Sequence, residues 1–407
     1  MTRSTELEAR FGVANYDPLP VELCRGEGCC VWDTSGRRYL DFMSAYSAVS
    51  HGHAHPRLVR ALQDQAAELA MVSRAFRSDR LGEFLSRACE ITGMDRALPM
   101  NTGAEAVETA LKAARRWGYQ TKGIAPDQAE IIACHGNFHG RTLGALALSS
   151  EPAYRRNFGP FPPGMRQIPF GDAGALDASI GPQTAAFIVE PIQGEGGIVV
   201  PPAGYLAECA QICRRRNVLL ICDEIQTGLG RTGRVLACQH DRVKPDLLVL
   251  GKALGGGLYP VSLVLGSNDV WELFEPGSHG STFGGNPLAC AVGLEALDVL
   301  VEEDLAARAE DAGQYLRQQL IQLPSPPVRE VRGRGLLVGV ELEPGTLDAR
   351  TVCDRLLERG ILSRETRRYV LRLAPPLVVT REQIDVAVDQ LEAALAGPGP
   401  TRRETEQ

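Results

Sequence analysis

A lysine that follows a buried strand is the first candidate for chemistry in this 407-residue sequence. Residues 247–250 are all apolar, and Gly251, Lys252 and the glycine run 255–257 come directly after them. Only four of the 43 lysines and arginines are lysines, so arginine supplies most of the positive charge. A guanidinium cannot form an imine, whereas a desolvated lysine can lose its proton and attack a carbonyl. Lys252 is therefore a candidate Schiff-base lysine, and an ordinary lysine at a strand end is the alternative.

Two other groups would complete a site for an aldehyde cofactor. Asp223 follows the apolar run 218–222, and a carboxylate there could keep a pyridine nitrogen protonated. Thr102 and Glu105 have the spacing of a capping box, so Gly103 would open a helix whose first amides could bind a phosphate. Together with the lysine, these groups meet the requirements of pyridoxal phosphate chemistry. The alternative is a capping aspartate, an exposed lysine and an empty helix start, which requires three coincidences.

A mostly parallel sheet must position these residues. Apolar runs without polar alternation, which are typical of strands covered on both faces, alternate with helical patterns up to about residue 290. The runs are 131–134, 185–189, 218–222, 247–250 and 261–265. Polar groups at the carboxyl ends of such strands line the ligand crevice, so Asp223 and Lys252 should lie close together. The sequence thus predicts an α/β fold with helices on both sides of the sheet and a smaller α+β lobe.

The length and the pattern divide the chain into four parts. A chain of 407 residues is too long for one core. We expect an N-terminal segment that packs with the small lobe (1–45), a large domain that binds the cofactor (46–290), a C-terminal small domain (291–396) and a disordered tail (397–407).

The composition argues against several classes of protein. The net charge is −7 and no basic run is present, so we expect no nucleic-acid surface. No apolar run approaches the roughly 20 residues of a membrane helix, and residues 1–10 do not resemble a targeting peptide. The 11 cysteines lack C-x-x-C spacing, which favours reduced thiols in a cytoplasmic enzyme. His51, His53 and His55 lie in a Gly/Pro turn without a carboxylate or cysteine companion, so we expect no metal site.

From about Tyr16 to about Val379 the chain resembles the class III aminotransferases, which are pyridoxal phosphate enzymes of fold type I. The matching stretches follow the order of the family and span nearly the whole chain. They include 100–106 (MNTGAEA), 136–142 (GNFHGRT), 190–195 (EPIQGE), 223–228 (DEIQTG), 251–254 (GKAL), 279–287 (HGSTFGGNP) and 372–376 (RLAPP). Within the family, the similarity is greatest to the ornithine branch.

The resemblance implies a role for each cofactor residue. Lys252 would bind pyridoxal phosphate as an imine and later move a proton between the substrate and the cofactor. Asp223 would pair with the pyridinium nitrogen. The other implied contacts are Gln226 with the ring hydroxyl, Phe138 with the ring face, Gly103 and Ala104 with the phosphate, and Ser281 and Thr282 with the phosphate bound by the neighbouring subunit. The last pair implies a homodimer, or a higher oligomer, with shared sites; a polar loop is the alternative.

The resemblance also implies five substrate residues. Ornithine must react at its distal amine with its carboxylate far from the cofactor, whereas 2-oxoglutarate must place one carboxylate close to it. Arg141 would bind the distant carboxylate and Arg372 the near one, and Glu195 would mask Arg372 while ornithine is bound. Tyr16 and Tyr46 would contact the α-amino end. Acetylornithine and 4-aminobutyrate aminotransferases usually carry an aliphatic residue in place of Tyr46.

The reaction expected from the resemblance is transfer of the distal amino group of L-ornithine to 2-oxoglutarate, which gives L-glutamate 5-semialdehyde and L-glutamate. The alternative donors are acetylornithine, 4-aminobutyrate and other ω-amines. An aminomutase or racemase of the same fold is another alternative, but it does not need a masked second arginine. A pyridoxal phosphate-binding protein without catalysis is disfavoured, because Lys252 has all its expected companions. The partners are small amino and 2-oxo acids, proline biosynthesis is one pathway for the product, and no role is predicted for Arg77 or His139.

Overall fold

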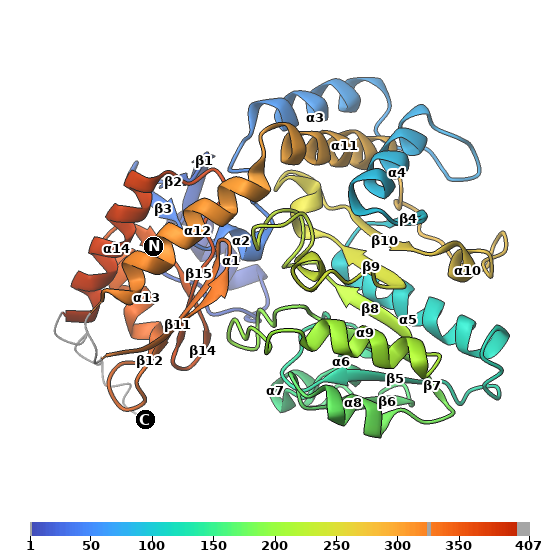
Figure 1. The fold of residues 1–407 in the computed structure, drawn as a ribbon. Helices are drawn as coiled ribbons and strands as arrows, with labels where there is room; N and C mark the ends of the chain where they lie inside the picture. Colours follow the sequence, from blue (N-terminus) through green and yellow to red (C-terminus); the bar gives the residue numbers. More distant parts are fainter. Residues whose placement is uncertain (1, 324–326, 397–407) are drawn as a thin grey trace.

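A seven-stranded sheet forms the centre of the larger lobe in the computed structural model, which describes residues 2–323 and 327–396 (Figure 1). The strand order is β4-β10-β9-β8-β7-β5-β6. Their bounds are Arg96–Met100 (β4), Glu130–Cys134 (β5), Met165–Ile168 (β6), Thr184–Val189 (β7), Leu219–Asp223 (β8), Leu247–Leu250 (β9) and Ser262–Gly266 (β10). Strands β5 to β9 are paired in parallel, and β10 is antiparallel to both of its neighbours. The predicted α/β class with a mostly parallel sheet is confirmed.

Both faces of this sheet are buried. Along β8, Leu220 and Cys222 belong to one core cluster, whereas Leu219 and Ile221 belong to the other. This alternation is expected, because successive side chains of a strand point to opposite faces. The covering helices are α3 (Pro56–Glu68), α4 (Asp79–Thr92), α8 (Ala173–Ser179), α9 (Tyr205–Arg215) and α11 (Pro287–Glu302) toward one side, and α5 (Gly103–Gln120), α6 (Leu143–Leu148) and α10 (Asn268–Trp271) toward the other.

The smaller lobe has a four-stranded antiparallel sheet with the order β11-β12-β15-β14. Its strands are Val328–Arg334 (β11), Leu337–Leu342 (β12), Arg364–Arg367 (β14) and Val370–Leu373 (β15). Three helices lie with this sheet, α12 (Leu305–Ile321), α13 (Ala349–Glu358) and α14 (Arg381–Ala396). The predicted α+β lobe is therefore present.

The N-terminal segment extends the small lobe. It contains α1 (Arg3–Phe11), which has no buried residue, and the strands β1 (Leu23–Glu27), β2 (Cys30–Asp33) and β3 (Arg38–Asp41). Strand β3 pairs in parallel with β13 (Ile361–Leu362), a strand of the C-terminal part. The division of the chain at 45/46 and 290/291 stays a prediction. Helix α11 crosses the second of these boundaries. The predicted tail, 397–407, lies outside the described residues.

Arg231 joins the two lobes beside the site. Its side chain is fully buried, and burial lowers its pKa to about 9. The guanidinium donates to the carbonyls of Leu336 (3.1 Å) and Pro375 (2.5 Å) in the small lobe, and to the hydroxyls of Ser44 (3.2 Å) and Ser50 (3.0 Å). Ser44 begins the short element α2 (Ser44–Ser47), whose four residues all have positive φ. Because this conformation is unfavourable for residues with a Cβ, such anchoring contacts must maintain it.

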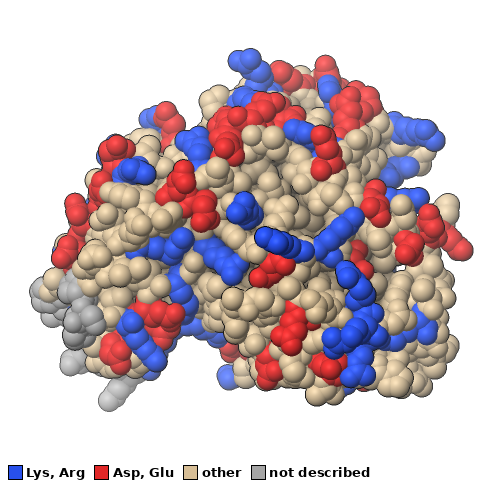
Figure 2. Space-filling view, in the orientation of Figure 1, with Lys and Arg blue, Asp and Glu red and all other residues tan. Residues whose placement is uncertain are grey.

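Acidic and basic side chains both occur on the two lobes in the view of Figure 2. Within residues 2–323 and 327–396, no helix is long and apolar enough to cross a membrane, and no group of three His, Cys, Asp or Glu side chains could hold a metal ion.

Candidate active site

The carboxyl ends of β8 and β9 border a cavity of about 320 Å³. Six of the eight predicted cofactor residues line it, namely Gly103, Ala104, Phe138, Asp223, Gln226 and Lys252. They come from the start of α5, the loop after β5, and the segments that follow β8 and β9. The sheet thus brings together residues that are up to 149 positions apart in the sequence.

Lys252 is the amine of this cavity. It begins the short 3-10 helix η2 (Lys252–Gly255) directly after β9 and has φ +44°. Burial lowers its pKa to about 8, although the negative charges of Glu195 and Asp223 oppose the shift. A lower pKa increases the neutral fraction near neutral pH, and the neutral amine is the form that attacks a carbonyl. The environment therefore supports the chemistry predicted for this residue.

Asp223 is held by a histidine for which the sequence predicted no role. One carboxylate oxygen lies 2.7 Å from Nδ1 of His139, and the other accepts from the Ile225 amide at 3.1 Å. Burial alone would lower the pKa of His139, but the hydrogen bond to Asp223 and the negative charges of Asp223 and Glu190 together raise it. A protonated His139 donates at Nδ1 to Asp223 and orients the carboxylate. An ionised carboxylate is the form that can pair with a pyridinium nitrogen.

A second carboxylate lies behind this pair. Glu190 accepts from the amides of Phe138 (3.0 Å) and Gly194 (3.4 Å), and burial raises its pKa to about 7. The charge on His139 opposes that rise, whereas the charge on Asp223 adds to it. Glu190 gains a proton more readily than an exposed glutamate, because its two amide hydrogen bonds only partly offset its burial.

The phosphate end of the cavity is the start of α5. Thr102 accepts from the Glu105 amide, and Glu105 accepts in return from the Thr102 amide, which completes the predicted capping box. A Cβ on Gly103 would lie 2.9 Å from the Ile225 side chain, so glycine permits the close packing there. The first-turn amides and the helix dipole suit a phosphate.

The polar atoms that line the same cavity show whether the site fits pyridoxal phosphate. Gln226 Oε1 and His139 Nε2 are buried and have no hydrogen-bond partner among the described residues. The cavity also offers an amine, an ionised carboxylate and a helix start, which match the aldehyde, the ring nitrogen and the phosphate of the cofactor. The residues present fit pyridoxal phosphate.

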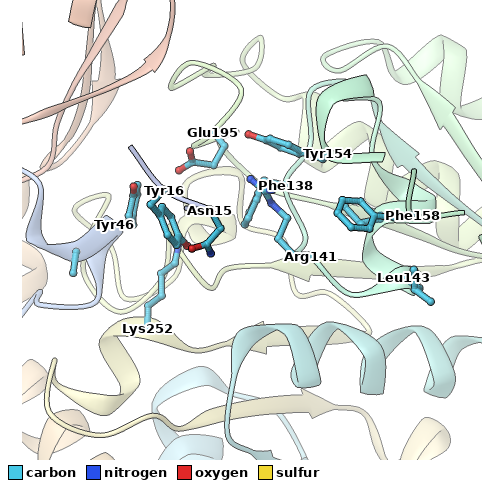
Figure 3. Close-up of a pocket in the computed structure, with 12 residues that line it drawn as sticks. Asn15, Tyr16, Tyr46, Phe138, Arg141, Leu143, Tyr154, Phe158, Glu195 and Lys252 are labelled. Carbon is cyan, nitrogen blue, oxygen red and sulfur yellow. The ribbon is translucent and has the colours of Figure 1, made fainter. Parts of the chain in front are cut away.

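A larger cavity of about 590 Å³ adjoins this site and shares Phe138, Arg141, Glu195 and Lys252 with it. Figure 3 shows Tyr16 and Tyr46 on one side of it and Arg141 on the other. Four of the five predicted substrate residues line this cavity, and the fifth, Arg372, contacts two of them. Tyr16 is 80% exposed and comes from the N-terminal segment before β1.

Arg372 is covered by Glu195. Its side chain, on β15, is 1% exposed, and its Nη1 donates to Oε1 of Glu195. Burial alone would raise the pKa of Glu195, but Arg372 lowers it, so the two form an ion pair. The guanidinium also lies 4.5 Å from the ring centroid of Tyr46. Its Nε and Nη2 find no acceptor among the described residues, so another acceptor could bind beside Glu195.

The loop that carries Glu195 is attached to the small lobe. The Gly194 carbonyl accepts from Thr366 at 3.1 Å, and Arg332 donates to the carbonyls of Gly197 and Ile198. Glu195 itself is held more loosely by Gln226, whose Nε2 lies 3.5 Å away. The backbone on both sides is therefore fixed, while the side chain of Glu195 depends on Arg372.

Arg141 differs from Arg372 in having no acidic partner among the described residues. Its guanidinium lies 3.6 Å from the ring centroid of Tyr154 and 5.6 Å from that of Phe138. The site thus holds one free guanidinium at the cavity wall and one that is masked.

Ser281 and Thr282 line neither cavity of this chain. The Ser281 hydroxyl accepts from Asn101 at 2.8 Å and from the Gly284 amide at 3.2 Å, and Thr282 is exposed. Their predicted contact with the neighbouring subunit stays a prediction. Six other residues of the larger cavity were not predicted, because short helices and connecting loops without a long periodic pattern place them there: Asn15, Ala45, Leu143, Leu146, Tyr154 and Phe158.

Comparisons with known proteins agree with this geometry. The family model described as aminotransferase class-III matches residues 11–395. The chain is 54% identical to ornithine aminotransferase 2 of Staphylococcus aureus over 394 residues, which are 96% of this chain and 99% of that protein. Its structure is similar to that of ornithine aminotransferase from Toxoplasma gondii (TM-score 0.94, 48% identity, 96% and 94% of the chains covered). It is also similar to acetylornithine aminotransferase from Elizabethkingia anophelis (TM-score 0.87, 45% identity, 96% and 98% covered).

The lowered pKa of Lys252 predicts the pH dependence of cofactor attachment. When cofactor-free protein is mixed with pyridoxal phosphate, the rate of covalent attachment should rise with pH, pass its midpoint near pH 8 and then level off, because only the neutral amine attacks. Stopped-flow absorbance in the visible range measures this rate. Lys244→Ala, which changes a lysine that is 61% exposed, is the matched control. A rate that is still rising steeply at pH 10, or attachment to Lys252→Ala, would contradict the assignment.

Proposed function

The chain belongs to the class-III aminotransferases, and from that premise we propose that its amino donor is L-ornithine and its acceptor 2-oxoglutarate. The δ-amino group is transferred, so the products are L-glutamate 5-semialdehyde and L-glutamate. The cofactor is pyridoxal phosphate, which supplies the carbonyl that accepts the amino group and a ring that withdraws electrons from the reacting carbon. The names of the relatives in Staphylococcus aureus and Toxoplasma gondii support this donor.

The observation that carries the proposal is the difference between the two arginines. Ornithine has one carboxylate, and Arg141 is the guanidinium that is free to pair with it. If Arg372 were uncovered, it would attract the same carboxylate and bring the α-amine to the cofactor. Glu195 neutralises Arg372 and removes this competing mode. The arrangement therefore favours reaction at the δ-amine.

We assign Lys252 as the residue that attaches the cofactor and then moves a proton at the substrate carbon. Asp223, oriented by His139, holds the proton on the ring nitrogen. Gln226 binds the ring hydroxyl and Phe138 covers the ring face. The amides of Gly103 and Ala104 bind the phosphate.

The acceptor half of the cycle requires a change at Glu195. 2-Oxoglutarate has two carboxylates and reacts at the carbon beside one of them, so both arginines must be available to it. We infer that Glu195 leaves Arg372 when this carboxylate arrives, while its loop stays attached to the small lobe. Donor and acceptor thus use one site in turn, as expected for a ping-pong cycle.

Tyr16 and Tyr46 are assigned to the α-amino end of ornithine, where both line the larger cavity. Acetylornithine or another ω-amine is the alternative donor. The similarity to the acetylornithine aminotransferase of Elizabethkingia anophelis supports this alternative. By the family resemblance, Tyr46 favours ornithine, since an aliphatic residue is expected there in enzymes that use the other donors. An aminomutase or racemase would not need the masked Arg372.

We further propose a homodimer in which Ser281 and Thr282 contact the phosphate of the partner's cofactor. A cavity of about 400 Å³ beside Thr102, Gly103 and Lys252 offers room for a partner at the phosphate end. A cytoplasmic location and a role in proline biosynthesis are retained as proposals. The amine and the aldehyde of the product can close to the cyclic imine from which proline is formed, which supports the second.

Donor specificity is tested with L-ornithine alone. We expect the visible absorption of the cofactor-loaded protein to disappear, glutamate 5-semialdehyde to be trapped with o-aminobenzaldehyde, and the absorption to return when 2-oxoglutarate is added. Bleaching by N-acetylornithine or 4-aminobutyrate, but not by ornithine, would contradict the proposed donor. Turnover without any keto-acid would instead indicate an isomerase.

Glu195→Gln tests the masking of Arg372. The variant keeps the shape of the side chain but removes its charge, so Arg372 should attract the ornithine carboxylate. We expect the ratio of δ- to α-amine transfer to fall about tenfold, while the reaction with L-glutamate changes less than about twofold. Product analysis after single turnovers measures the ratio. Glu272→Gln, at an exposed ion pair with Arg96, is the control; unchanged selectivity in Glu195→Gln would refute the masking role.

The shared site is tested by Thr282→Ala. We expect light scattering to give twice the chain mass of 44.0 kDa for both the wild type and the variant, and the variant to bind pyridoxal phosphate about tenfold more weakly, because a hydrogen bond to a charged group is lost. Thr121→Ala, at the exposed end of α5, is the control. A monomer with full activity would rule out the shared site.

A further inference from the structure

We propose that Tyr154 is a positioning residue that holds Arg141 ready for the substrate carboxylate. The inference rests on the proposed function, because it concerns the carboxylate that Arg141 binds. It adds a residue that the motifs do not include, since Tyr154 lies between the matched stretches 136–142 and 190–195.

The contact between Tyr154 and Arg141 is a close stack. The guanidinium carbon lies 3.6 Å from the centroid of the Tyr154 ring. Phe138 meets Tyr154 edge to face, with centroids 6.2 Å apart, and lies 5.6 Å from the same guanidinium. Figure 3 shows the three side chains together on the cavity wall opposite Tyr16 and Tyr46. Tyr154 thus joins the arginine to the side chain assigned to the cofactor ring.

Stacking leaves the hydrogen-bonding edge of Arg141 free. A guanidinium uses its flat face in a cation–π contact, whereas it uses the N–H groups at its edge to bind a carboxylate. Arg141 itself is exposed and has no acidic partner among the described residues. Without the ring, the long side chain would lose its freedom only when substrate binds, and that loss would weaken binding.

Tyr154 is fixed by the segment that carries it. It lies in α7 (Pro152–Arg155). The residue that precedes this helix, Glu151, pairs with Arg367 of β14 at 2.9 Å. On the other side, Arg155 donates to the Ser149 carbonyl at 2.9 Å and lies over the Phe161 ring at 4.7 Å. The ion pair of Glu151 therefore links the segment of Tyr154 to the small lobe, which also carries Arg372.

The test compares Tyr154→Leu with Tyr154→Phe in steady-state kinetics of the cofactor-loaded enzyme. Leucine fills similar space without a π face, so we expect the KM for L-ornithine to rise about fivefold while kcat changes less than about twofold. Phenylalanine keeps the face, so its KM should stay within about twofold of the wild type. The KM for 2-oxoglutarate should follow the same order, because its distant carboxylate also meets Arg141. Tyr154→Ala gives the same comparison if the leucine variant does not fold.

Two controls separate stacking from a general effect on the segment. Phe161→Ala removes the neighbouring cation–π contact of Arg155 and should leave both KM values within about twofold. In an Arg141→Met background, Tyr154→Leu should cause no further rise in KM, because the stacking partner is gone. An unchanged KM in Tyr154→Leu, an equal rise in Tyr154→Phe or Phe161→Ala, or additive effects with Arg141→Met would each overturn the inference.

The experiment distinguishes a failure of the role of Tyr154 from a failure of the proposed function. If the wild type does not use ornithine, the proposed donor is wrong, and the KM for 2-oxoglutarate still decides the role of Tyr154. If the wild type uses ornithine while Tyr154→Leu matches it, only the role of Tyr154 is wrong.

Discussion

The ion pair between Arg372 and Glu195 is the interaction on which the substrate end of the site depends. Arg372 is almost completely buried, and a buried guanidinium without a partner is costly. When the Glu195 side chain moves away, another anion must therefore pair with Arg372. The carboxylate of an incoming 2-oxo acid can take this place. The same requirement explains why the small lobe, which carries Arg372, also holds the loop of Glu195 through Arg332 and Thr366. The proposed substrate selection would thus depend on the contact between the lobes.

The cofactor end depends on a different constraint, the burial of charge at the edge of a parallel sheet. Burial lowers the pKa of Lys252 and raises that of Glu190, whereas His139 gives Asp223 the partner that an ionised carboxylate needs. One environment therefore provides an amine that can become neutral and a carboxylate that a histidine orients. The carboxyl ends of β8 and β9 place these groups in the same cavity.

Sequence reasoning predicted the parts of this structure that have local signals. Continuous apolar runs predicted β7, β8 and β9, and the Thr102–Glu105 spacing predicted the capping box of α5. The reversed direction of β10 was not predicted, because strand direction depends on connections and not on composition. The contact of His139 with Asp223 joins residues 84 positions apart, and no spacing rule pairs them. Tyr154 was missed because α7 has only four residues, too few for a half-buried aromatic residue to show a periodic signal.

A crystal structure of Lys252→Ala with pyridoxal phosphate and L-ornithine would test the central claim most directly, since the variant can bind the donor without completing the transfer. The account predicts that the α-carboxylate of ornithine pairs with Arg141, and that Glu195 remains on Arg372. An ornithine carboxylate paired with Arg372, with Glu195 displaced, would contradict it.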